Sequence, residues 1–472
     1  MAAFGLAMCA VAAAAVLPGV DHEDQHALPP NVLIVLTDDQ TFDTLPSTVG
    51  PAAMPWLESQ MNRPDGHWVT FSHAFIDTPL CCPSRASILT GLTSPHTGVQ
   101  TNADGFDLDE SATLGTWLDD AGYTTGLIGK YLNDFPWDRG PYVPPGWDRF
   151  VAKQNEGLGT TYYDYHLVDQ GVAAVVGHAP EDYATTYLAD QALGFLRAAP
   201  TDAPWFLMFT PPAPHEPWLP AREDRGVFDG QPVPTPSERV LNDVRGKPAW
   251  IRALPAITAD EQALFTEHRR RERETLLAVD RAVRALAEAV EARGELDRTI
   301  IIVLTDNGFS FGEHRWQGKR CAYEECVRTP LVVRSPWTAS STVDDLVMNI
   351  DLAPTIMDLV SSTSGASPMP TDGMSLRPWL DQDAAAAPVW RPGVLLQYAG
   401  DDQVPPWSAV RTHDFTFVRN ADGTVELYDL TGVVGPADPH EVNNRAGTTP
   451  YAGVQERLDA LLTSLVAAQT DG

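Results

Sequence analysis

The chain has 472 residues, 43% of them hydrophobic, which is enough for a large globular core and argues against a disordered chain. The formal net charge of −31 at pH 7 argues against nucleic acid or an anionic membrane as a partner, because like charges repel. Salt at physiological concentration screens charges over roughly 8–10 Å, which only partly reduces the repulsion between this chain and an anionic substrate. Such a substrate would therefore need a locally basic site.

Residues 1–20 form an alanine-rich apolar segment with no charge between Met1 and Leu17. The segment is similar to the apolar core of a secretory signal, although a positively charged start is missing. We therefore expect an exported protein that is secreted, periplasmic or held at the cell surface. An uncleaved anchor and a mis-chosen start codon remain as alternatives. No other apolar run reaches membrane-spanning length, so no integral membrane partner is expected.

Four apolar, β-branched or aromatic runs predict strands, at 31–36, 123–128, 205–210 and 299–304. Such runs are typical of strands that are buried on both faces of a mainly parallel sheet. Each run ends at polar residues, and in an open α/β sheet ligands bind at that edge. The polar residues that follow the four runs include, in chain order, Asp38 and Asp39, Lys130, His215, and Asp306 and Asn307.

Helical periodicity separates these strands, at 113–121, 260–293 and 351–360. In the long segment 260–293, apolar residues that begin with Leu264 recur on one side, which predicts a crossover helix packed against the sheet. The predicted fold class is therefore α/β, with a large, mainly parallel sheet flanked by helices.

The Ala/Pro-rich stretch 381–392 indicates a domain boundary. Beyond it, the turn residues Asn420-Ala421-Asp422-Gly423 join the runs 408–418 and 424–430, which predicts an antiparallel hairpin. The segment 451–468 is predicted to be an amphipathic helix. The predicted organisation is a signal-like leader at 1–20, a large domain at 30–385 and a smaller α+β subdomain with an antiparallel sheet at 386–472.

The stretch Cys81-Cys82-Pro83-Ser84-Arg85-Ala86-Ser87-Ile88-Leu89-Thr90-Gly91 predicts a short helix. Pro83 suits its first turn, and Gly91 suits a left-handed residue at its end. Cys81 then lies at the helix N-terminus, where free N–H groups favour an anion, and Arg85 adds a permanent positive charge one turn later. This pattern predicts a nucleophile that faces an anion-binding site. The alternative is an ordinary buried cysteine at a helix start.

Asp38, Asp39, Asp306 and Asn307 offer oxygen donors at two strand ends that share the sequence Val-Leu-Thr-Asp. Hard cations such as Ca²⁺ and Mg²⁺ need such ligands. Three carboxylates placed together without a cation would repel one another. Taken alone, however, either pair could simply cap a turn or a helix.

The pattern Cys-x-Pro-Ser-Arg-x-x-x-Leu-Thr-Gly resembles the signature of the type I sulfatases, of the alkaline-phosphatase-like superfamily. Lys130 in Gly-Lys-Tyr, His215 in Pro-His-Glu-Pro and Lys319 in Gly-Lys match the family in chain order. The resemblance covers about residues 31–380. It is closest to the N-acetylglucosamine-6-sulfatase branch, on the string at 81–91, Gly-Lys-Tyr-Leu-Asn at 129–133, Tyr-Tyr-Asp-Tyr at 162–165, Ala-Pro-His at 213–215 and Asn-Ile-Asp-Leu-Ala-Pro-Thr-Ile at 349–356.

The resemblance implies that a formylglycine-generating enzyme oxidises Cys81 to Cα-formylglycine, whose hydrate attacks the sulfur of a sulfate ester. It implies a divalent cation, usually Ca²⁺ and less often Mg²⁺, held by Asp38, Asp39, Asp306, Asn307 and the modified Cys81. The implied catalytic residues are Cys81, Arg85, Lys130, His215 and Lys319, with Asp306 accepting the proton of the hydrate and His215 as the acid. The implied substrate-binding residues are Lys130, His215, Lys319 and, at the rim of the site, His314.

The expected activity is release of sulfate from a sulfated saccharide of the N-acetylglucosamine-6-sulfate type or from a glycosaminoglycan fragment. An arylsulfatase, a phosphate or phosphonate ester hydrolase, and a non-catalytic glycan-binding protein with unmodified Cys81 are the alternatives. Many family members carry a histidine where Leu132 stands, so the base that releases sulfate is left open. Cys321 and Cys326 are close enough in sequence to bridge, but the sequence does not show whether they do.

Overall fold

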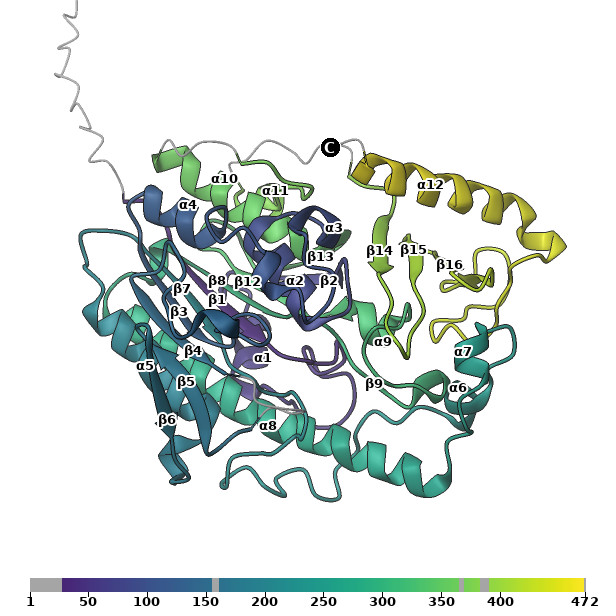
Figure 1. Cartoon of the computed structure of the whole chain (residues 1–472), viewed down its shortest axis with the longest axis horizontal. Coiled ribbons are helices and arrows are strands. Elements are labelled where there is room, and N and C mark those ends of the chain that lie inside the picture. Colours follow the sequence, from purple (N-terminus) through teal and green to yellow (C-terminus); the bar gives the residue numbers. More distant parts are fainter. Residues whose placement is uncertain (1–27, 155–160, 365–368, 383–389, 471–472) are drawn as a thin grey trace, which may run out of the picture.

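The computed structural model describes residues 28–154, 161–364, 369–382 and 390–470, and its overall arrangement is drawn in Figure 1. The signal-like leader lies outside the described residues, as does most of the Ala/Pro-rich boundary. In the described part of the chain, no helix is both long enough and apolar enough to span a membrane.

A large sheet forms the centre of the molecule, with strands in the order β11-β2-β12-β8-β1-β7-β3-β4-β5-β6 and with β13 beside β2. The central run β8-β1-β7-β3-β4 is parallel, and antiparallel pairs flank it on both sides. The strands are β1 (Asn31–Thr37), β2 (Trp68–Phe75), β3 (Thr124–Gly129), β4 (Arg149–Lys153), β5 (Tyr165–Asp169), β6 (Val172–Val176), β7 (Trp205–Thr210), β8 (Thr299–Thr305), β11 (Arg328–Thr329), β12 (Leu331–Arg334) and β13 (Ser341–Met348). The four predicted strands are the central β1, β3, β7 and β8, so the predicted fold class is confirmed.

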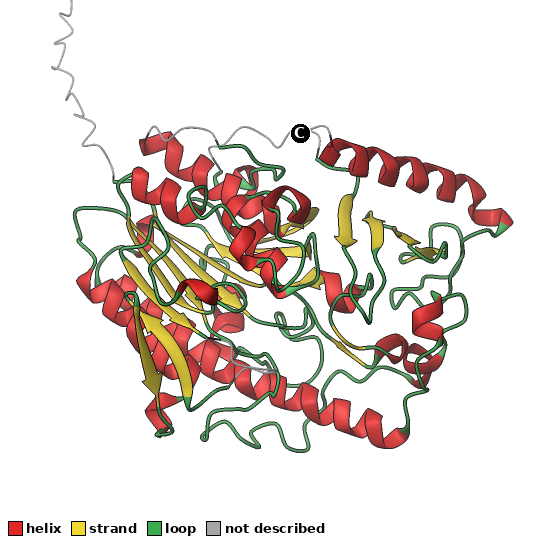
Figure 2. Ribbon diagram, viewed as in Figure 1, coloured by secondary structure: helices red, strands yellow, loops and turns green. Residues whose placement is uncertain are grey.

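Helices cover both faces of this sheet, as Figure 2 shows. Along β1, Val32, Ile34 and Leu36 pack with residues of α2, α4 and α10, whereas Leu33 and Val35 pack with residues of α1, α5 and α8. This alternation explains why β1 reads as a continuous apolar run. The helices are α1 (Pro55–Met61), α2 (Cys81–Thr90), α3 (Ser94–Thr97), α4 (Leu114–Asp120), α5 (Ala184–Ala198), α6 (Glu238–Asn242), α7 (Ala249–Arg252), α8 (Ala259–Ala292), α9 (Glu324–Val327), α10 (Leu352–Ser364), α11 (Arg377–Leu380) and α12 (Ala452–Thr470).

The long helix α8 begins at a capping box. The Thr258 hydroxyl accepts the N–H of Glu261 (3.2 Å), and the Glu261 carboxylate accepts the N–H of Thr258 (2.8 Å). One detail of the predicted apolar stripe is wrong, since Leu264 is 50% exposed. Its neighbour Phe265 takes the inward position and packs with Phe309 and other aromatic residues.

A second, antiparallel sheet lies beside the first, with the order β14 (Val394–Tyr398), β15 (Trp407–Arg411), β16 (Phe415–Asn420) and β17 (Val425–Asp429). Helix α12 packs on one face of it. The hairpin predicted around Asn420–Gly423 joins β16 to β17 as expected. The run 408–418, expected as one strand, is instead two, because the chain turns where Thr412 and Phe415 exchange hydrogen bonds.

Candidate active site

The carboxyl ends of the central strands meet at one point. The N–H of Asp38 donates to the carbonyl of Ala213 (3.2 Å), the N–H of Lys130 donates to the carbonyl of Thr210 (2.8 Å), and the N–H of Asp306 donates to the last carbonyl of β1 (3.2 Å). These contacts continue the parallel pairing of β1, β3, β7 and β8 beyond the strands. The predicted polar residues therefore lie together, as the strand endings implied.

Gly129 lets Lys130 enter this site. Its φ angle is +132°, and a Cβ atom at this position would lie 2.0 Å from the carbonyl oxygen of Thr210. Any side chain would separate β3 from β7, so glycine is required before Lys130.

Cys81 is the first residue of α2, and Gly91 ends that helix in the left-handed conformation (φ 73°), both as predicted. The N–H of Cys82 donates to the side-chain oxygen of Asn102 (3.0 Å), which satisfies one of the free donors at the helix N-terminus. The Cys82 side chain is buried in the core of the large sheet. The sequence did not predict this role for Asn102, because the N–H group that it binds lies on another element, α2.

The Cys81 sulfur is buried among charged groups. Lys319 Nζ lies 2.7 Å from it, and Asp38 Oδ1 lies 3.5 Å from it. Burial raises the pKa of this thiol to about 12, although Lys130 and Lys319 act in the opposite direction. Because the thiolate is the reactive form, unmodified Cys81 would be a poor nucleophile at neutral pH.

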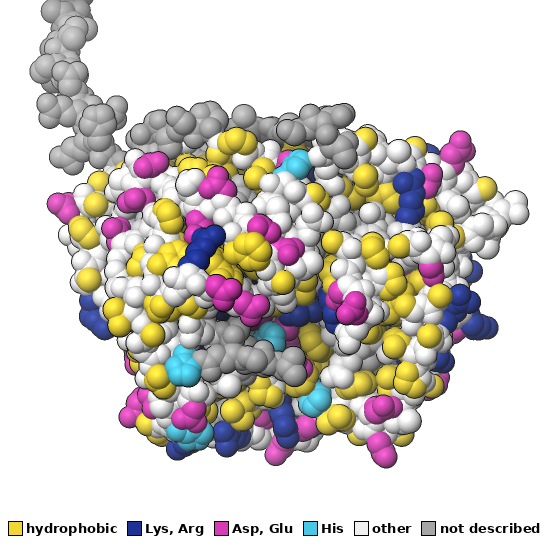
Figure 3. All heavy atoms as spheres, in the orientation of Figure 1, with side chains coloured by type: hydrophobic (Ala, Val, Ile, Leu, Met, Phe, Trp, Pro, Cys, Tyr) yellow, Lys and Arg dark blue, Asp and Glu magenta, His cyan; other side chains and the backbone are white. Residues whose placement is uncertain are grey.

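Three cations alternate with three carboxylates around Cys81. The distances are 2.7 Å from Lys130 Nζ to Asp38 Oδ2, 2.7 Å from Arg85 Nε to Asp306 Oδ2, and 2.6 Å from Lys319 Nζ to Asp39 Oδ1. Acidic and basic side chains are interspersed over the face shown in Figure 3, whereas Arg85 and Lys130 are almost completely buried. The site thus gathers three cations, and the carboxylates of Asp38, Asp39 and Asp306 balance their charge.

The two buried carboxylates Asp38 and Asp306 differ in their pKa values. Burial alone would raise the pKa of Asp38, but Lys130, His215, Arg85 and Lys319 together lower it below its usual value. Burial and the neighbouring Asp38 raise the pKa of Asp306, even though Arg85 and Lys130 oppose them. The surrounding cations therefore favour the ionised form of Asp38, whereas burial and Asp38 favour the neutral form of Asp306.

Side chains around Cys81 could hold a divalent cation. One donor atom each from Asp38, Asp39, Cys81 and His215 lies within 4.8 Å of the others, which gives two carboxylate oxygens, one sulfur and one ring nitrogen. Among the described residues, Asp39 Oδ2 and Asn307 Oδ1 are buried without a hydrogen-bond partner. The Asn307 amide is held by donation from Nδ2 to Asp39 Oδ1 (2.5 Å), which leaves its oxygen available. A cation would satisfy these buried oxygens, whose isolation is otherwise costly.

His215 lies at the opening of the site, with its side chain 16% exposed. Its Nδ1 donates to the carbonyl of Glu216 (2.8 Å), which leaves Nε2 directed at the site, 3.4 Å from Asp39 Oδ2. The buried hydroxyl of Tyr162 donates to the His215 carbonyl (2.6 Å) and holds this loop. Sequence reasoning did not assign this role to Tyr162, although the Tyr-rich stretch at 162–165 marked the region.

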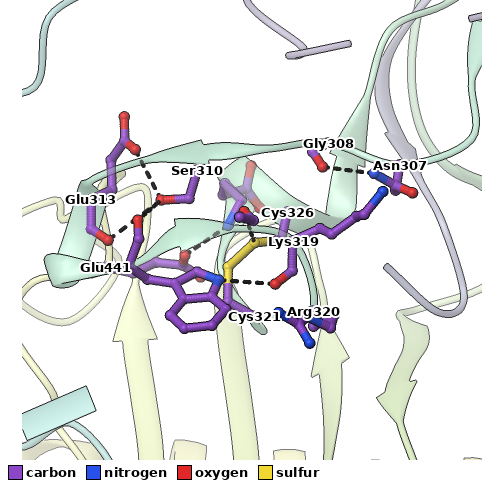
Figure 4. Close-up of a disulfide and its surroundings, with 12 residues drawn as sticks. Asn307, Gly308, Ser310, Glu313, Lys319, Arg320, Cys321, Cys326 and Glu441 are labelled. Atoms are coloured by element: carbon purple, nitrogen blue, oxygen red, sulfur yellow. Dashed lines mark hydrogen bonds between the residues drawn. A yellow bond between two sulfur atoms is a disulfide. The ribbon is translucent and has the colours of Figure 1, made fainter. Parts of the chain in front are cut away.

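Lys319 directly follows a short two-stranded ribbon, β9 (Ser310–Phe311) and β10 (Gln317–Gly318), and is labelled in Figure 4. The indole N–H of Trp316 donates to the Lys319 carbonyl (2.9 Å), and the next N–H, that of Arg320, donates to the carbonyl of Pro79 (3.1 Å). The disulfide that the sequence left open is present, between Cys321 and Cys326. It closes the segment that directly follows Lys319.

His314 does not lie at the rim. Its side chain is completely buried in the 3₁₀ turn Glu313–Arg315, with its ring 4.4 Å from that of Tyr323. Burial, with a contribution from Lys247, lowers the pKa of His314 well below its usual value. The expectation of a rim position is therefore wrong. Leu132 is also buried, in the core of the large sheet.

A buried network that the sequence did not reveal holds α2 in place. The Asn349 amide donates to Asp77 Oδ1 (2.9 Å) and to the Ser84 hydroxyl (3.1 Å), and its oxygen accepts the N–H of Asp77 (3.0 Å). Asp77 Oδ2 accepts the Ser87 hydroxyl (3.2 Å). These residues fix the helix that carries Cys81.

Replacing Asn349 with alanine should lower the free energy of unfolding by about 1–3 kcal/mol, because the N–H and one carboxylate oxygen of Asp77 lose their partner inside the protein. Urea unfolding would measure the change. Asn62→Ala, at an exposed position, is the control and should change stability by no more than about 0.5 kcal/mol. A loss in Asn349→Ala no greater than in the control would remove this network from the forces that hold α2.

Comparison with known proteins identifies the family. The sulfatase family model matches residues 30–362. The chain belongs to the sulfatase family. It is therefore a sulfuric ester hydrolase. A second model, for the C-terminal part of N-sulphoglucosamine sulphohydrolase, matches residues 312–468 of this sulfatase.

Relatives agree with this assignment. This sulfatase is 28% identical to an N-acetylglucosamine-6-O-sulfatase of Bacteroides thetaiotaomicron, over 98% of this chain and 89% of the relative. It is 35% identical to the human N-acetylglucosamine-6-sulfatase, over 79% of this chain and 68% of that protein. A solved structure in complex with its substrate D-glucosamine-2-N,6-O-disulfate matches with a TM-score of 0.80 and 27% identity, over 94% of this chain and 99% of the other. The phosphonate monoester hydrolase of Agrobacterium radiobacter shares the fold (TM-score 0.74, 22% identity).

Proposed function

We propose that this sulfatase hydrolyses the 6-sulfate ester of an N-acetylglucosamine-type residue in a sulfated saccharide, such as a glycosaminoglycan fragment. The observation that carries the proposal is the position of Cys81, at a helix N-terminus and 2.7 Å from Lys319 Nζ, where the carboxyl ends of the central strands meet. The names of the two relatives and the disulfate bound in the similar structure support the choice of sugar.

Cys81 is proposed to act as Cα-formylglycine, made by a formylglycine-generating enzyme during maturation. Water adds to the aldehyde to give a geminal diol. One of its oxygens attacks sulfur as the bond between sulfur and the sugar oxygen breaks. The other hydroxyl then loses its proton and reforms the aldehyde as sulfate leaves. The complete string from Cys81 to Gly91 and the low reactivity of the buried thiol support this modification. Asp306, whose pKa is raised, is the proposed acceptor for the proton released on attack.

The basic residues are proposed to bind the sulfuryl oxygens. Arg85, Lys130 and Lys319 present cationic groups around Cys81, where negative charge develops in the transition state. His215 is the proposed acid for the leaving sugar hydroxyl. Its Nδ1 proton is engaged by the Glu216 carbonyl, so the imidazolium form carries the transferable proton on Nε2. Lys130, His215 and Lys319 are also the proposed substrate-binding residues.

The proposed cation is Ca²⁺, held by Asp38, Asp39, Asp306, Asn307 and residue 81. One buried oxygen of Asp39 and one of Asn307 have no hydrogen-bond partner in the part of the chain that the structure describes, which supports this set. Hard oxygen donors suit Ca²⁺ or, less well, Mg²⁺. A bound cation would supply charge that stabilises an anionic nucleophile and the sulfate group.

Asp39→Ala should lose bound calcium and activity together. The variant removes one buried oxygen that lacks a hydrogen bond, and it breaks the contacts of Asp39 with Lys319 and Asn307. Elemental analysis of the dialysed protein would measure the metal, and circular dichroism would check the fold. Asp65→Ala, on the exposed surface, is the matched control and should keep full occupancy. Full calcium occupancy in Asp39→Ala would exclude Asp39 as a ligand.

Sulfate release tests the proposed activity directly. The purified enzyme should release inorganic sulfate from N-acetylglucosamine-6-sulfate much faster than it releases phosphate from an aryl phosphate. Faster turnover of the phosphate ester would instead assign a phosphate or phosphonate hydrolase. Saccharide binding without release of either anion would assign a non-catalytic glycan-binding protein.

Export and domain organisation are further parts of the proposal. The apolar leader at 1–20 supports secretion, a periplasmic location or attachment at the cell surface. A relative in Drosophila melanogaster, 32% identical over 79% of this chain and 33% of that protein, is named an extracellular sulfatase homologue. We further propose that residues 30–385 form the catalytic domain and residues 386–472 the C-terminal α+β subdomain.

A further inference from the structure

Helix α8 carries a buried arginine, Arg269, outside the group of cations around Cys81. Its guanidinium lies between two carboxylates, with Nη1 2.9 Å from Asp43 Oδ2 and Nη2 2.8 Å from Glu313 Oε1. Arg269 is 5% exposed and Glu313 is 3% exposed, so salt screens this pairing little. A planar guanidinium can hold two acceptors in fixed directions, which an ammonium group cannot do with the same geometry.

The two carboxylates belong to two segments that supply the candidate site. Asp43 follows Asp39 in the segment 38–44, directly after β1. Glu313 lies between β9 and β10, the ribbon that Lys319 follows, and both residues are labelled in Figure 4. Lys319 joins the same two segments, since its Nζ lies 2.6 Å from Asp39 Oδ1. Arg269 is therefore a second connection between the segments that meet at the site.

The segment 38–44 is also held by bonds that do not involve Arg269. The N–H of Gln40 donates to Thr305 Oγ1 (3.1 Å), and the N–H of Thr41 donates to Glu272 Oε1 (2.9 Å). These bonds fasten the segment to the end of β8 and to α8. It can therefore serve as a fixed support to which Arg269 attaches the ribbon.

Glu313 transmits this support to the ribbon. Its Oε2 accepts the N–H of Phe311 in β9 (2.7 Å), and the Arg269 guanidinium lies over the Phe311 ring, 5.2 Å from the ring centre. Strand β9 pairs with β10, and Lys319 is the next residue after β10. A displacement of Glu313 would therefore be carried to Lys319.

We propose that Arg269 is a positioning residue that holds the Lys319 ammonium against residue 81, by fixing Glu313 to the segment 38–44. This inference rests on the proposed role of Lys319 in binding the sulfuryl oxygens. A cation that is displaced from the reacting group stabilises the transition state less. Arg269 should therefore affect catalysis through Lys319.

Arg269→Lys tests the proposal, because it keeps the positive charge between the carboxylates and removes the fork that reaches both. The value of kcat/KM for an aryl sulfate should fall about tenfold. In a Lys319→Met background the same change should cost no more than about twofold, because the group that Arg269 positions is gone. Arg284→Lys, at an exposed arginine of the same helix, is the matched control and should change neither value. Equal losses from Arg269→Lys in both backgrounds would overturn the proposal.

A labelling measurement follows Lys319 without turnover. In the wild type its side chain is 14% exposed and paired with Asp39, so acetic anhydride, which reacts with the neutral amine, should acetylate it slowly. Arg269→Lys should raise the rate of acetylation at residue 319 severalfold, as measured by mass spectrometry of its peptide, and Arg284→Lys should leave it unchanged. The fully buried Lys247 is the internal control and should stay unlabelled in every variant.

The outcomes separate this proposal from the proposed function. An unchanged rate at Lys319 in Arg269→Lys would overturn the positioning role, and so would a rise at Lys247 as well, because it would show a general loosening of the fold. A raised rate at Lys319 alone, with unchanged kcat/KM, would keep the positioning of Lys319 by Arg269 and overturn the catalytic role proposed for Lys319.

Discussion

Cys81→Ala should lower kcat/KM for sulfate esters by at least about 10³-fold, since the attacking group is lost while the binding cations remain. Cys81→Ser should be almost as inactive when the protein is made in a host that modifies cysteine alone. In the wild type, mass spectrometry of the peptide that contains residue 81 should show an aldehyde in place of the thiol. Sulfate release and this mass measurement together test the nucleophile.

The adjacent Cys82 provides a matched control. It is also a free, buried cysteine, but its side chain packs in the core of the large sheet. Cys82→Ala should therefore keep the aldehyde at residue 81 and most of the activity. A fully active enzyme whose residue 81 carries only a free thiol would overturn the formylglycine assignment.

His215→Ala should slow the hydrolysis of sugar sulfates about 10²–10⁴-fold more than that of aryl sulfates. A sugar hydroxyl is a poor leaving group and needs a proton, whereas a phenolate leaves without one. Nε2 of His215 faces the site 3.4 Å from Asp39, and the side chain is partly exposed, so it can reach the leaving oxygen. Values of kcat/KM for both substrate types on both proteins would measure the difference.

Tyr162→Phe is the companion variant, because it removes only the hydrogen bond to the His215 carbonyl. It should show the same substrate preference with a smaller loss. Equal losses on sugar and aryl sulfates in His215→Ala would assign His215 to sulfate binding, and the acid would then be sought at Lys319.

Much of the fold and of the site could be predicted because the relevant signals are local. A strand buried on both faces needs a continuous apolar run, so β1 and β8 could be recognised in the sequence. Pro83 favours the first turn of α2, and Gly91 ends the helix, through backbone preferences that act within one turn. The polar residues that follow the strands could be placed at one edge because parallel strands share a direction.

Other features depended on residues far apart in the chain. Asp77 and Asn349 are separated by 272 positions, and neither residue type signals a partner at that distance. The direction of a side chain in an irregular turn is likewise decided by what packs against it, so His314 was expected at the rim and is buried against Tyr323. The turn at Thr412 within the run 408–418 is different, because it is held locally by the hydrogen bonds between Thr412 and Phe415.

The sequence by itself determined the chemistry of the candidate site, since the residue types and the strand and helix ends that carry them are encoded locally. Only the tertiary structure decided how these residues are paired. It set Lys319 against Cys81 and left Asp39 Oδ2 and Asn307 Oδ1 without a hydrogen-bond partner among the described residues. The reason is physical: periodicity and capping act over a few residues, whereas register and side-chain packing join segments that the linear order separates.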